Sequence, residues 1–341
     1  MGTPLILIVI IVAVAVVFDF INGFHDAANS IATIVATRVL TPVWAVVWAA
    51  AFNFIAAFVA GTGVAKTVGS GMVTLSYVTP YVILAGLIGA ITWDLITWWW
   101  GLPSSSTHAL LGGYAGAAMA HAAYLHGIAS SLKPLNPSGW TKTLISIVVA
   151  PLLGMVLAYA LMVLLYWLFQ KATPKRMDAW FRVLQLGSSA ALSFSHGAND
   201  AQKTAGIIAG VLFTSGVTSK FEIPAWVLLL AYTAIAAGTL SGGWRIVHTM
   251  GGRLTRLKPR SGFCAETAGA LSILIATHMD IPVSTTQVIA GSIAGVGSIQ
   301  RLKAVRWGLA ANILWAWVLT IPAAGIVGWL SMLAIHVLLG K

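Results

Sequence analysis

The segment Asn22-Gly-Phe-His-Asp26 in the first half of the chain aligns with His196-Gly-Ala-Asn-Asp200 in the second half. In each segment an acid interrupts an apolar stretch and is flanked by amide or imidazole side chains. The alignment places Asp26 opposite Asp200. The two segments therefore indicate that one structural unit occurs twice in the chain.

Two further blocks repeat in the same order. Residues 42–69, which begin Pro-Val-Trp, align without gaps on residues 224–251, which begin Pro-Ala-Trp. Residues 102–108, Leu-Pro-Ser-Ser-Ser-Thr-His, align with residues 281–287, Ile-Pro-Val-Ser-Thr-Thr-Gln. Three collinear matches indicate an internal duplication. The prediction is a first repeat over residues 1–170, a basic cytoplasmic linker over residues 171–182 and a second repeat over residues 183–341.

The composition places the chain in a bilayer. Of 341 residues, 59% are hydrophobic and only 8% are charged, and the mean hydropathy is +0.91, whereas soluble domains are about one-quarter charged. A span needs about 20 apolar residues, so the length permits roughly ten to twelve crossings or half-crossings. The single cysteine excludes an internal disulfide, and no Cys/His cluster has zinc or iron–sulfur spacing. We expect an all-α polytopic membrane protein without a cofactor.

Apolar length predicts twelve helical segments, several of them too short to span. Breaks at Asn22-Gly23, at His196-Gly197, at Pro103 and at Pro282 predict half-helices that meet at the membrane midplane. Such breaks are tolerated only where the freed backbone groups are buried in protein or line a wet cavity. The predicted segments are 4–22, 24–37, 42–65, 77–100, 104–128, 142–170, 181–197, 200–214, 224–246, 262–280, 283–299 and 304–338.

The net charge is +11, and most Lys and Arg residues lie in short loops. Because cytoplasmic loops are enriched in Lys and Arg, the positions of these residues indicate the membrane topology. The loop over residues 245–260 is strongly basic, whereas its counterpart after Lys66 has no further Lys or Arg up to Pro80. Residues 301–306 are likewise more basic than residues 133–142. Corresponding loops therefore face opposite sides, which predicts inverted-topology repeats. With the linker inside, both termini are expected outside.

Hydroxyl residues open the helices that are predicted after the two prolines. Free N–H groups at a helix start, several hydroxyls and the helix dipole together suit a tetrahedral oxyanion. The alternative is helix capping, or close packing by small residues such as the pairs Gly112/Gly116 and Gly291/Gly295. Because the feature occurs in both halves, we favour anion binding. The residues are Ser104, Ser105, Ser106 and Thr107 in the first half, and Ser284, Thr285 and Thr286 in the second.

Acids in or beside apolar segments are the second candidate feature. Ionisable groups at membrane depth are costly, and they line cavities, form pairs or mark ion pathways. Asp26 and Asp200 are the predicted coupling residues, binding either a hard cation such as sodium or a proton; the structural alternative is an N-cap or a hydrogen-bonded buried acid. For Glu266, ion coupling and a structural pair with a basic neighbour are equally favoured. The six acids are Asp19, Asp26, Asp94, Asp200, Glu266 and Asp280.

The motifs resemble those of a known family. Asn22-Gly-Phe-His-Asp-Ala-Ala-Asn29, Ser195-His-Gly-Ala-Asn-Asp200 and the Pro-x-Ser-x-Thr elements at 103 and 282 are similar to the inorganic phosphate transporter (Pit) family over nearly the whole chain. The resemblance implies import of phosphate with sodium or protons, in many bacterial members as a complex with a divalent metal. It implies that the hydroxyls at 104–107 and 284–286, with Asn29 and Asn199, contact phosphate. Asp26 and Asp200 would then bind the coupling cation, as sodium sites in sodium-coupled members.

The second acidic motif departs from that pattern. Sodium-coupled relatives carry Asp-Val-Ala-Asn in both halves, whereas this chain has Asp200-Ala-Gln-Lys203. Lys203 can pair with an acid or contact substrate, and its fixed ammonium can replace one cation. The resemblance thus implies unequal ion roles for Asp26 and Asp200. Because Glu266 resembles an acid of sodium-coupled relatives, it is a third candidate coupling residue.

Other functions compete with phosphate import into the cell. A sulfate permease of the same fold is the first alternative, since both anions are tetrahedral. An intramembrane hydrolase fits poorly, because no oriented set of nucleophile, base and oxyanion donors is evident. A channel is the third alternative, although inverted repeats with half-helices are typical of alternating access. We therefore expect a transporter of the cell membrane rather than an enzyme, either a monomer or a homodimer.

Overall fold

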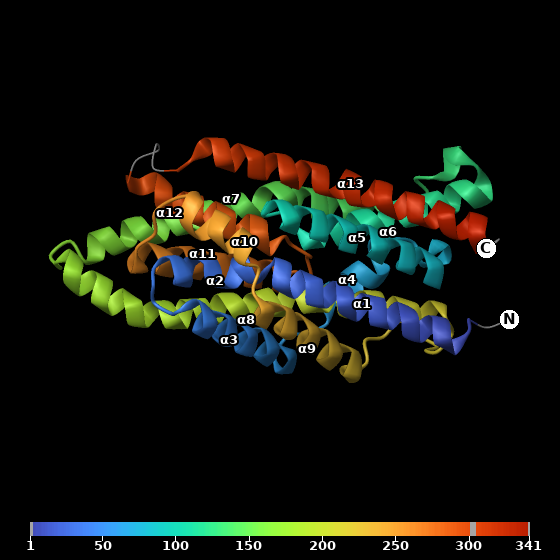
Figure 1. The fold of residues 1–341 in the computed structure, drawn as a ribbon, viewed down its shortest axis with the longest axis horizontal. Helices are drawn as coiled ribbons and strands as arrows, with labels where there is room; N and C mark the ends of the chain where they lie inside the picture. The colour runs from blue at the N-terminus through green and yellow to red at the C-terminus, as the bar shows by residue number, and fades with distance from the viewer. Residues whose placement is uncertain (1–2, 301–304, 340–341) are drawn as a thin grey trace.

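The computed structural model describes residues 3–300 and 305–339, which form the elongated bundle of helices in Figure 1. Within these residues the β pairing is limited to one isolated bridge, between Val73 and Leu135. Four helical stretches are long and apolar enough to cross a membrane, and six if each of two bent helix pairs counts as one span. The expected all-α polytopic membrane fold is confirmed.

Helices make up most of the described residues in both halves of the chain. In the first half they are α1 (Leu5–His25), α2 (Ala27–Ala36), α3 (Pro42–Ile55), η1 (Ala56–Phe58), α4 (Gly63–Ser70), η2 (Leu75–Tyr77), α5 (Pro80–Trp100), α6 (Ser106–His126), η3 (Ile128–Ser130) and α7 (Pro137–Leu168). In the second half they are α8 (Pro174–Thr214), α9 (Ala225–Ser241), α10 (Trp244–His248), η4 (Thr249–Arg253), α11 (Pro259–His278), α12 (Thr285–Gln300) and α13 (Trp307–Leu339).

The breaks predicted at Pro103 and Pro282 are confirmed. Helix α5 ends at Gly101, which has a φ of +64° that glycine adopts without strain, and α6 begins at Ser106. In the second half α11 ends at His278 and α12 begins at Thr285. Both helices that carry hydroxyl residues therefore start inside the chain's apolar core rather than at a long loop.

The break predicted at His196-Gly197 is wrong. Helix α8 runs without interruption from Pro174 to Thr214, so it also contains most of the predicted linker. In the first half a break does occur, at Asp26 between α1 and α2. The glycines act instead as contact points, because a Cβ on Gly197 would overlap the backbone of Asn53, and one on Gly23 would overlap the backbone of Ile235. Such glycines permit close helix approach in a continuous helix.

Two segments predicted as single helices are bent pairs. Residues 42–65 form α3, η1 and the start of α4, and the two parts meet at 86°. Residues 224–246 form α9 and the start of α10, which meet at 61°. Helix α9 ends at Gly242, whose φ is +70°, and the tight turn there does not interrupt the apolar pattern that predicted one helix.

Close helix crossings recur at corresponding positions of the two halves. Gly112 and Gly116 of α6 lie against the backbone of Ile321 and Gly325 on α13. In the same way Gly291 and Gly295 of α12 lie against the backbone of Pro151 and Met155 on α7. The Gly-x-x-x-Gly pairs are therefore packing positions, and each half contributes the long helix that packs on the other half's hydroxyl-bearing helix.

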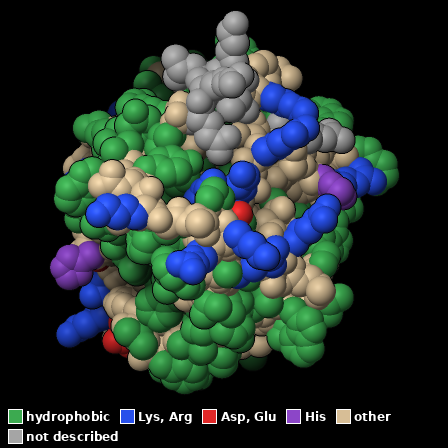
Figure 2. Space-filling model, turned by 90° about the vertical axis from the view of Figure 1, so that its left-hand side faces the viewer, with side chains coloured by type: hydrophobic (Ala, Val, Ile, Leu, Met, Phe, Trp, Pro, Cys, Tyr) green, Lys and Arg blue, Asp and Glu red, His purple; other side chains and the backbone are tan. Residues whose placement is uncertain are grey.

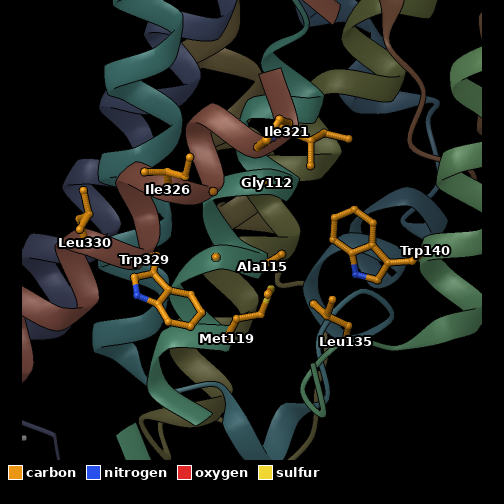
Figure 3. A pocket seen from close by; sticks show the side chains of 12 residues that line it. Gly112, Ala115, Met119, Leu135, Trp140, Ile321, Ile326, Trp329 and Leu330 are labelled. Atoms are coloured by element: carbon orange, nitrogen blue, oxygen red, sulfur yellow. The ribbon is translucent and has the colours of Figure 1, made fainter. Parts of the chain in front are cut away.

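A cavity of about 520 Å³ lies beside the crossing of α6 and α13. Figure 3 shows Gly112 and Ile321 near the crossing, with Trp140 and Trp329 on the two sides of the opening. None of its lining residues is charged, and none is a predicted site residue. The cavity is suited to apolar groups and lies apart from the polar centre of the bundle.

Basic side chains gather at one end of the bundle. Both termini lie at one end in Figure 1, and the α7–α8 connection lies at the other. Figure 2 views this second end and shows many Lys and Arg side chains on it. Arg301 and Lys303 of the basic loop at 301–306 lie outside the described residues. The end of the bundle that carries the predicted linker is therefore rich in basic side chains.

Candidate functional site

The starts of α6 and α12 meet the acidic segments of α2 and α8 in the centre of the bundle. Asn29 of α2 donates to Thr285 Oγ1 at 3.1 Å and to Thr286 Oγ1 at 2.8 Å. Lys203 of α8 donates to Thr107 Oγ1 at 2.5 Å. Since Thr107 corresponds to Thr286 in the alignment, Asn29 and Lys203 each bind the hydroxyl-bearing helix of the other half. All five side chains are buried.

Asp26 is held by an imidazole and a hydroxyl. The Nδ1 atom of His25 lies 2.7 Å from Asp26 Oδ1, and its Nε2 atom lies 3.1 Å from Thr97 Oγ1 on α5. Thr286 donates to Asp26 Oδ1 at 3.4 Å. These contacts concentrate on one carboxylate oxygen and orient the side chain toward the start of α12.

Asp200 has partners on both carboxylate oxygens. Lys203 Nζ lies 2.5 Å from Oδ1, while His196 Nε2 and Thr285 Oγ1 each lie 3.2 Å from Oδ2. The His196 contact has the distance of an ion pair but not the geometry of a hydrogen bond. Asp200 and Asp26 thus occupy corresponding positions but differ in what they bind.

Lys203 links three parts of the site. Its ammonium also donates to the backbone carbonyl of Val283 at 2.8 Å, in the loop before α12, and the side chain is only 2% exposed. A buried ammonium is tolerated only when it is paired and hydrogen-bonded. Of the two readings of Lys203, pairing with an acid is therefore confirmed.

Asp26, His196 and Asp200 each offer one atom to a common point. These three ligand atoms lie within 4.8 Å of one another. Carboxylate oxygens suit hard cations such as Na⁺, whereas an imidazole nitrogen suits transition metals better. Lys203 already supplies a positive charge at Asp200, whereas the ion-pair partner of Asp26 among the described residues is His25.

The hydroxyl residues divide into two kinds. Ser105 accepts a hydrogen bond from the backbone N–H of His108 at 3.2 Å, and Ser284 accepts one from the N–H of Gln287 at 3.3 Å. At these two corresponding positions the capping alternative is therefore confirmed. The remaining hydroxyls are those of Ser104, Ser106, Thr107, Thr285 and Thr286, and all of them are buried.

Two of these hydroxyls belong to the surroundings of His25. Ser104 donates to Thr97 Oγ1 at 2.8 Å, and Ser106 Oγ lies 3.4 Å from His25 Nδ1. No sequence pattern pointed to Thr97, because threonine is common near the end of an apolar helix. It is nevertheless the residue that connects α5 to both His25 and Ser104.

Asn199 orients the loop before α12. Its amide group donates to Thr277 Oγ1 at 2.8 Å and to the carbonyl of Ile281 at 3.3 Å. Its Oδ1 atom accepts from the backbone N–H of Val283 at 3.3 Å. Asn199 therefore fixes the backbone on both sides of Pro282.

Glu266 lies in a separate buried cluster. It accepts hydrogen bonds from Thr33 at 2.6 Å, from Gln185 at 2.8 Å and from Ser188 at 2.5 Å. Neither Asp26 nor Asp200 is among its hydrogen-bond partners, and no basic side chain pairs with it in the described part of the chain. The described residues thus show neutral donors around Glu266 rather than a basic neighbour. Its three partners come from α2 and α8 and had no sequence signal.

Comparison with known proteins gives consistent results. A model of the family described as "Phosphate transporter family" matches residues 22–328. The chain is 53% identical to a probable low-affinity inorganic phosphate transporter of Rhizobium meliloti (strain 1021), over 96% of both chains. It is 41% identical to the protein of that description in Bacillus subtilis (strain 168), over 99% of this chain and 100% of the relative. A solved structure described as "The sodium-dependent phosphate transporter" matches with a TM-score of 0.87 and 26% identity, over 98% of this chain and all of that one.

Proposed function

This chain belongs to the phosphate transporter family, and from that premise we propose that it imports inorganic phosphate by symport with a cation. One observation carries the proposal: Asn29 and Lys203 hydrogen-bond to the two hydroxyl-bearing helix starts, and two buried acids lie beside these contacts. Hydrogen-bond donors for an anion and carboxylate ligands for a cation therefore lie side by side. Coupled transport requires both at one site.

Phosphate would bind at the starts of α6 and α12. Helix N-termini supply N–H donors and a favourable dipole for an anion, and the hydroxyls at these helix starts would add directional donors without a buried arginine. Ser105 and Ser284 would act by holding these N-termini in shape, and Asn199 by fixing the loop at Pro282. The hydroxyl donors to the anion are Ser104, Ser106, Thr107, Thr285 and Thr286, with Asn29 as an amide donor.

The coupling cation would bind at Asp26 rather than equally at both acids. Lys203 gives Asp200 a permanent positive partner, so a mobile cation is required chiefly at Asp26. The cation is Na⁺ or a proton: the solved relative is described as sodium-dependent, whereas the Asp200-Ala-Gln-Lys203 motif resembles proton-coupled bacterial members. Glu266 would be a further cation position, because its oxygens face only neutral donors. A complex of phosphate with a divalent metal is an alternative form of the cargo.

Transport would proceed by alternating access between two inverted repeats in the cell membrane. The matched crossings of α6 on α13 and of α12 on α7 support two equivalent units. The bent pairs α3/α4 and α9/α10 are at corresponding positions. With the basic end of the bundle in the cytoplasm, both termini would lie outside.

Uptake of labelled phosphate into proteoliposomes, under separately imposed sodium and pH gradients, tests this function. Accumulation that follows one gradient and survives a large sulfate excess is expected. Uptake that needs no gradient would indicate a channel, and strong inhibition by sulfate would favour a sulfate permease. No uptake of phosphate under either gradient would reject the proposed cargo.

A further inference from the structure

Asp94, like Asp19, is a buried acid that no part of the proposed transport cycle uses. It lies on α5 one turn before Thr97, and its side chain is fully buried. Neither of its carboxylate oxygens has a hydrogen-bond partner among the described residues. An ionisable group that is buried without partners costs several kcal/mol unless something compensates for it. Asp94 therefore has two acceptor atoms available for a ligand.

The neighbourhood of Asp94 is the start of α6. Helix α5 packs along α6, and Asp94 lies on α5 one turn before Thr97. Thr97, on the same face of α5, accepts a hydrogen bond from Ser104 at 2.8 Å. Asp94 therefore lies in the part of α5 that packs on the hydroxyl-bearing start of α6.

His25, which contacts Thr97 on the same helix face, already has a partner on each ring nitrogen. His25 interacts electrostatically with Asp94, but its Nδ1 atom lies against Asp26 and its Nε2 atom against Thr97. The imidazole therefore does not satisfy the Asp94 oxygens. The position that corresponds to Asp94 in the second half is Ile273, which is buried and apolar, so a packing role shared by both halves does not explain the acid.

A carboxylate beside an anion site has a specific use when the anion carries a hydrogen. Hydrogen phosphate and dihydrogen phosphate keep an acidic hydroxyl at neutral pH, which can donate to a carboxylate. Sulfate has none, so a second negative group beside it would be repulsive unless an additional proton were bound. Asp200 is less available for this role, because Lys203 and Thr285 already contact its two oxygens.

We propose that Asp94 accepts a hydrogen bond from the acidic hydroxyl of bound phosphate and thereby makes the site reject tetrahedral anions that lack such a hydroxyl. This inference rests on the proposed function and names the residue that sets its specificity. A site built to hydrogen-bond a substrate hydroxyl discriminates strongly against analogues without it, because its polar groups are then left unpaired.

The experiment is competition against labelled phosphate uptake by the full-length protein in proteoliposomes. Arsenate keeps an acidic hydroxyl, whereas sulfate and monofluorophosphate have none at neutral pH, and monofluorophosphate has nearly the shape of hydrogen phosphate. With the unaltered protein, arsenate should compete and the other two should not. Inhibition by monofluorophosphate as strong as that by arsenate would overturn the proposal without any variant.

The matched variants are Asp94→Asn and Asp19→Asn. An amide at 94 no longer repels sulfate, so the ratio of the sulfate to the arsenate inhibition constant should fall roughly tenfold to hundredfold, the effect expected for one hydrogen bond to a charged group. Asp19 is equally buried but receives its hydrogen bond from Thr204 on α8, so Asp19→Asn should keep the original ratio.

The outcomes separate this inference from the function on which it rests. An unchanged ratio in Asp94→Asn overturns the role of Asp94 while phosphate transport stands. No phosphate uptake by the unaltered protein overturns the proposed function itself. If Asp94→Asn does not fold, the comparison of monofluorophosphate with arsenate in the unaltered protein decides alone.

Discussion

Lys203 on α8 binds Thr107 at the start of α6, as Asn29 on α2 binds Thr286 at the start of α12. The two contacts are at corresponding positions, but one donor is a fixed cation and the other is neutral. A duplicated site has thus become electrostatically unequal. The difference lies in a single side chain and can be reversed by substitution.

Substitution of Lys203 by Asn should make the two halves alike. Asp200 would then lack its permanent cation, and a mobile one would be required in its place. We expect uptake by Lys203→Asn to depend more steeply on cation concentration than uptake by the unaltered protein. Initial rates of labelled phosphate uptake across a sodium series and a pH series measure this, with the exposed Lys66→Asn as control. Unchanged cation dependence would show that Lys203 does not act as a resident cation.

Asp26→Asn and Asp200→Asn should both abolish uptake, but for different reasons. Asp26→Asn removes the proposed cation site, and its buried partner His25 can become neutral by losing a proton, so the protein should lose less stability than Asp200→Asn. Asp200→Asn leaves the Lys203 ammonium buried without its acid, which typically costs about 3–5 kcal/mol. Thermal unfolding in detergent, measured with uptake, separates the two effects. Equal stability of the two variants would contradict the unequal pairing, and retained uptake in both would remove the coupling role.

The helix starts at this site were predictable from the sequence because proline and hydroxyl residues act locally. Pro103 and Pro282 end the preceding helical pattern, and the residues after them reappear as the starts of α6 and α12. The apposition of Asp26 and Asp200 followed from the repeat alone. Features of this kind depend on chain neighbours and on internal alignment, both of which a single sequence contains.

Tertiary contacts account for what the sequence did not reveal. A glycine that breaks a helix and one that lets two helices touch look identical, and Gly197 is of the second kind. The hydrogen-bond partners of Glu266 are common residues on distant helices, so nothing marked Gln185 or Ser188 in advance. Whether Ser105 and Ser284 cap their helices depends on backbone geometry that composition does not encode.

The crossing of α6 and α13 should be intolerant of any side chain at Gly112. A Cβ there would overlap the backbone carbonyl of Ile321, and neither helix can move without disturbing the start of α6. Overpacking of this kind typically costs about 1–3 kcal/mol, so Gly112→Ala should lower the unfolding temperature and reduce uptake. Gly308→Ala on α13 is the matched control, because open space surrounds that position. Equal unfolding temperatures for the two variants would argue against the crossing.

Glu266→Gln tests whether the acid outside the central cluster takes part in coupling. The carboxylate accepts from Thr33, Gln185 and Ser188, and a glutamine of nearly equal size keeps an acceptor oxygen but loses the charge. If a cation binds there, the variant should keep the Km for phosphate while the stimulation of uptake by a cation gradient falls. Thr33→Val, which removes one donor and keeps the charge, is the control and should retain that stimulation. A variant whose gradient dependence matches that of the unaltered protein would leave Glu266 as a purely structural acid, held by three neutral donors.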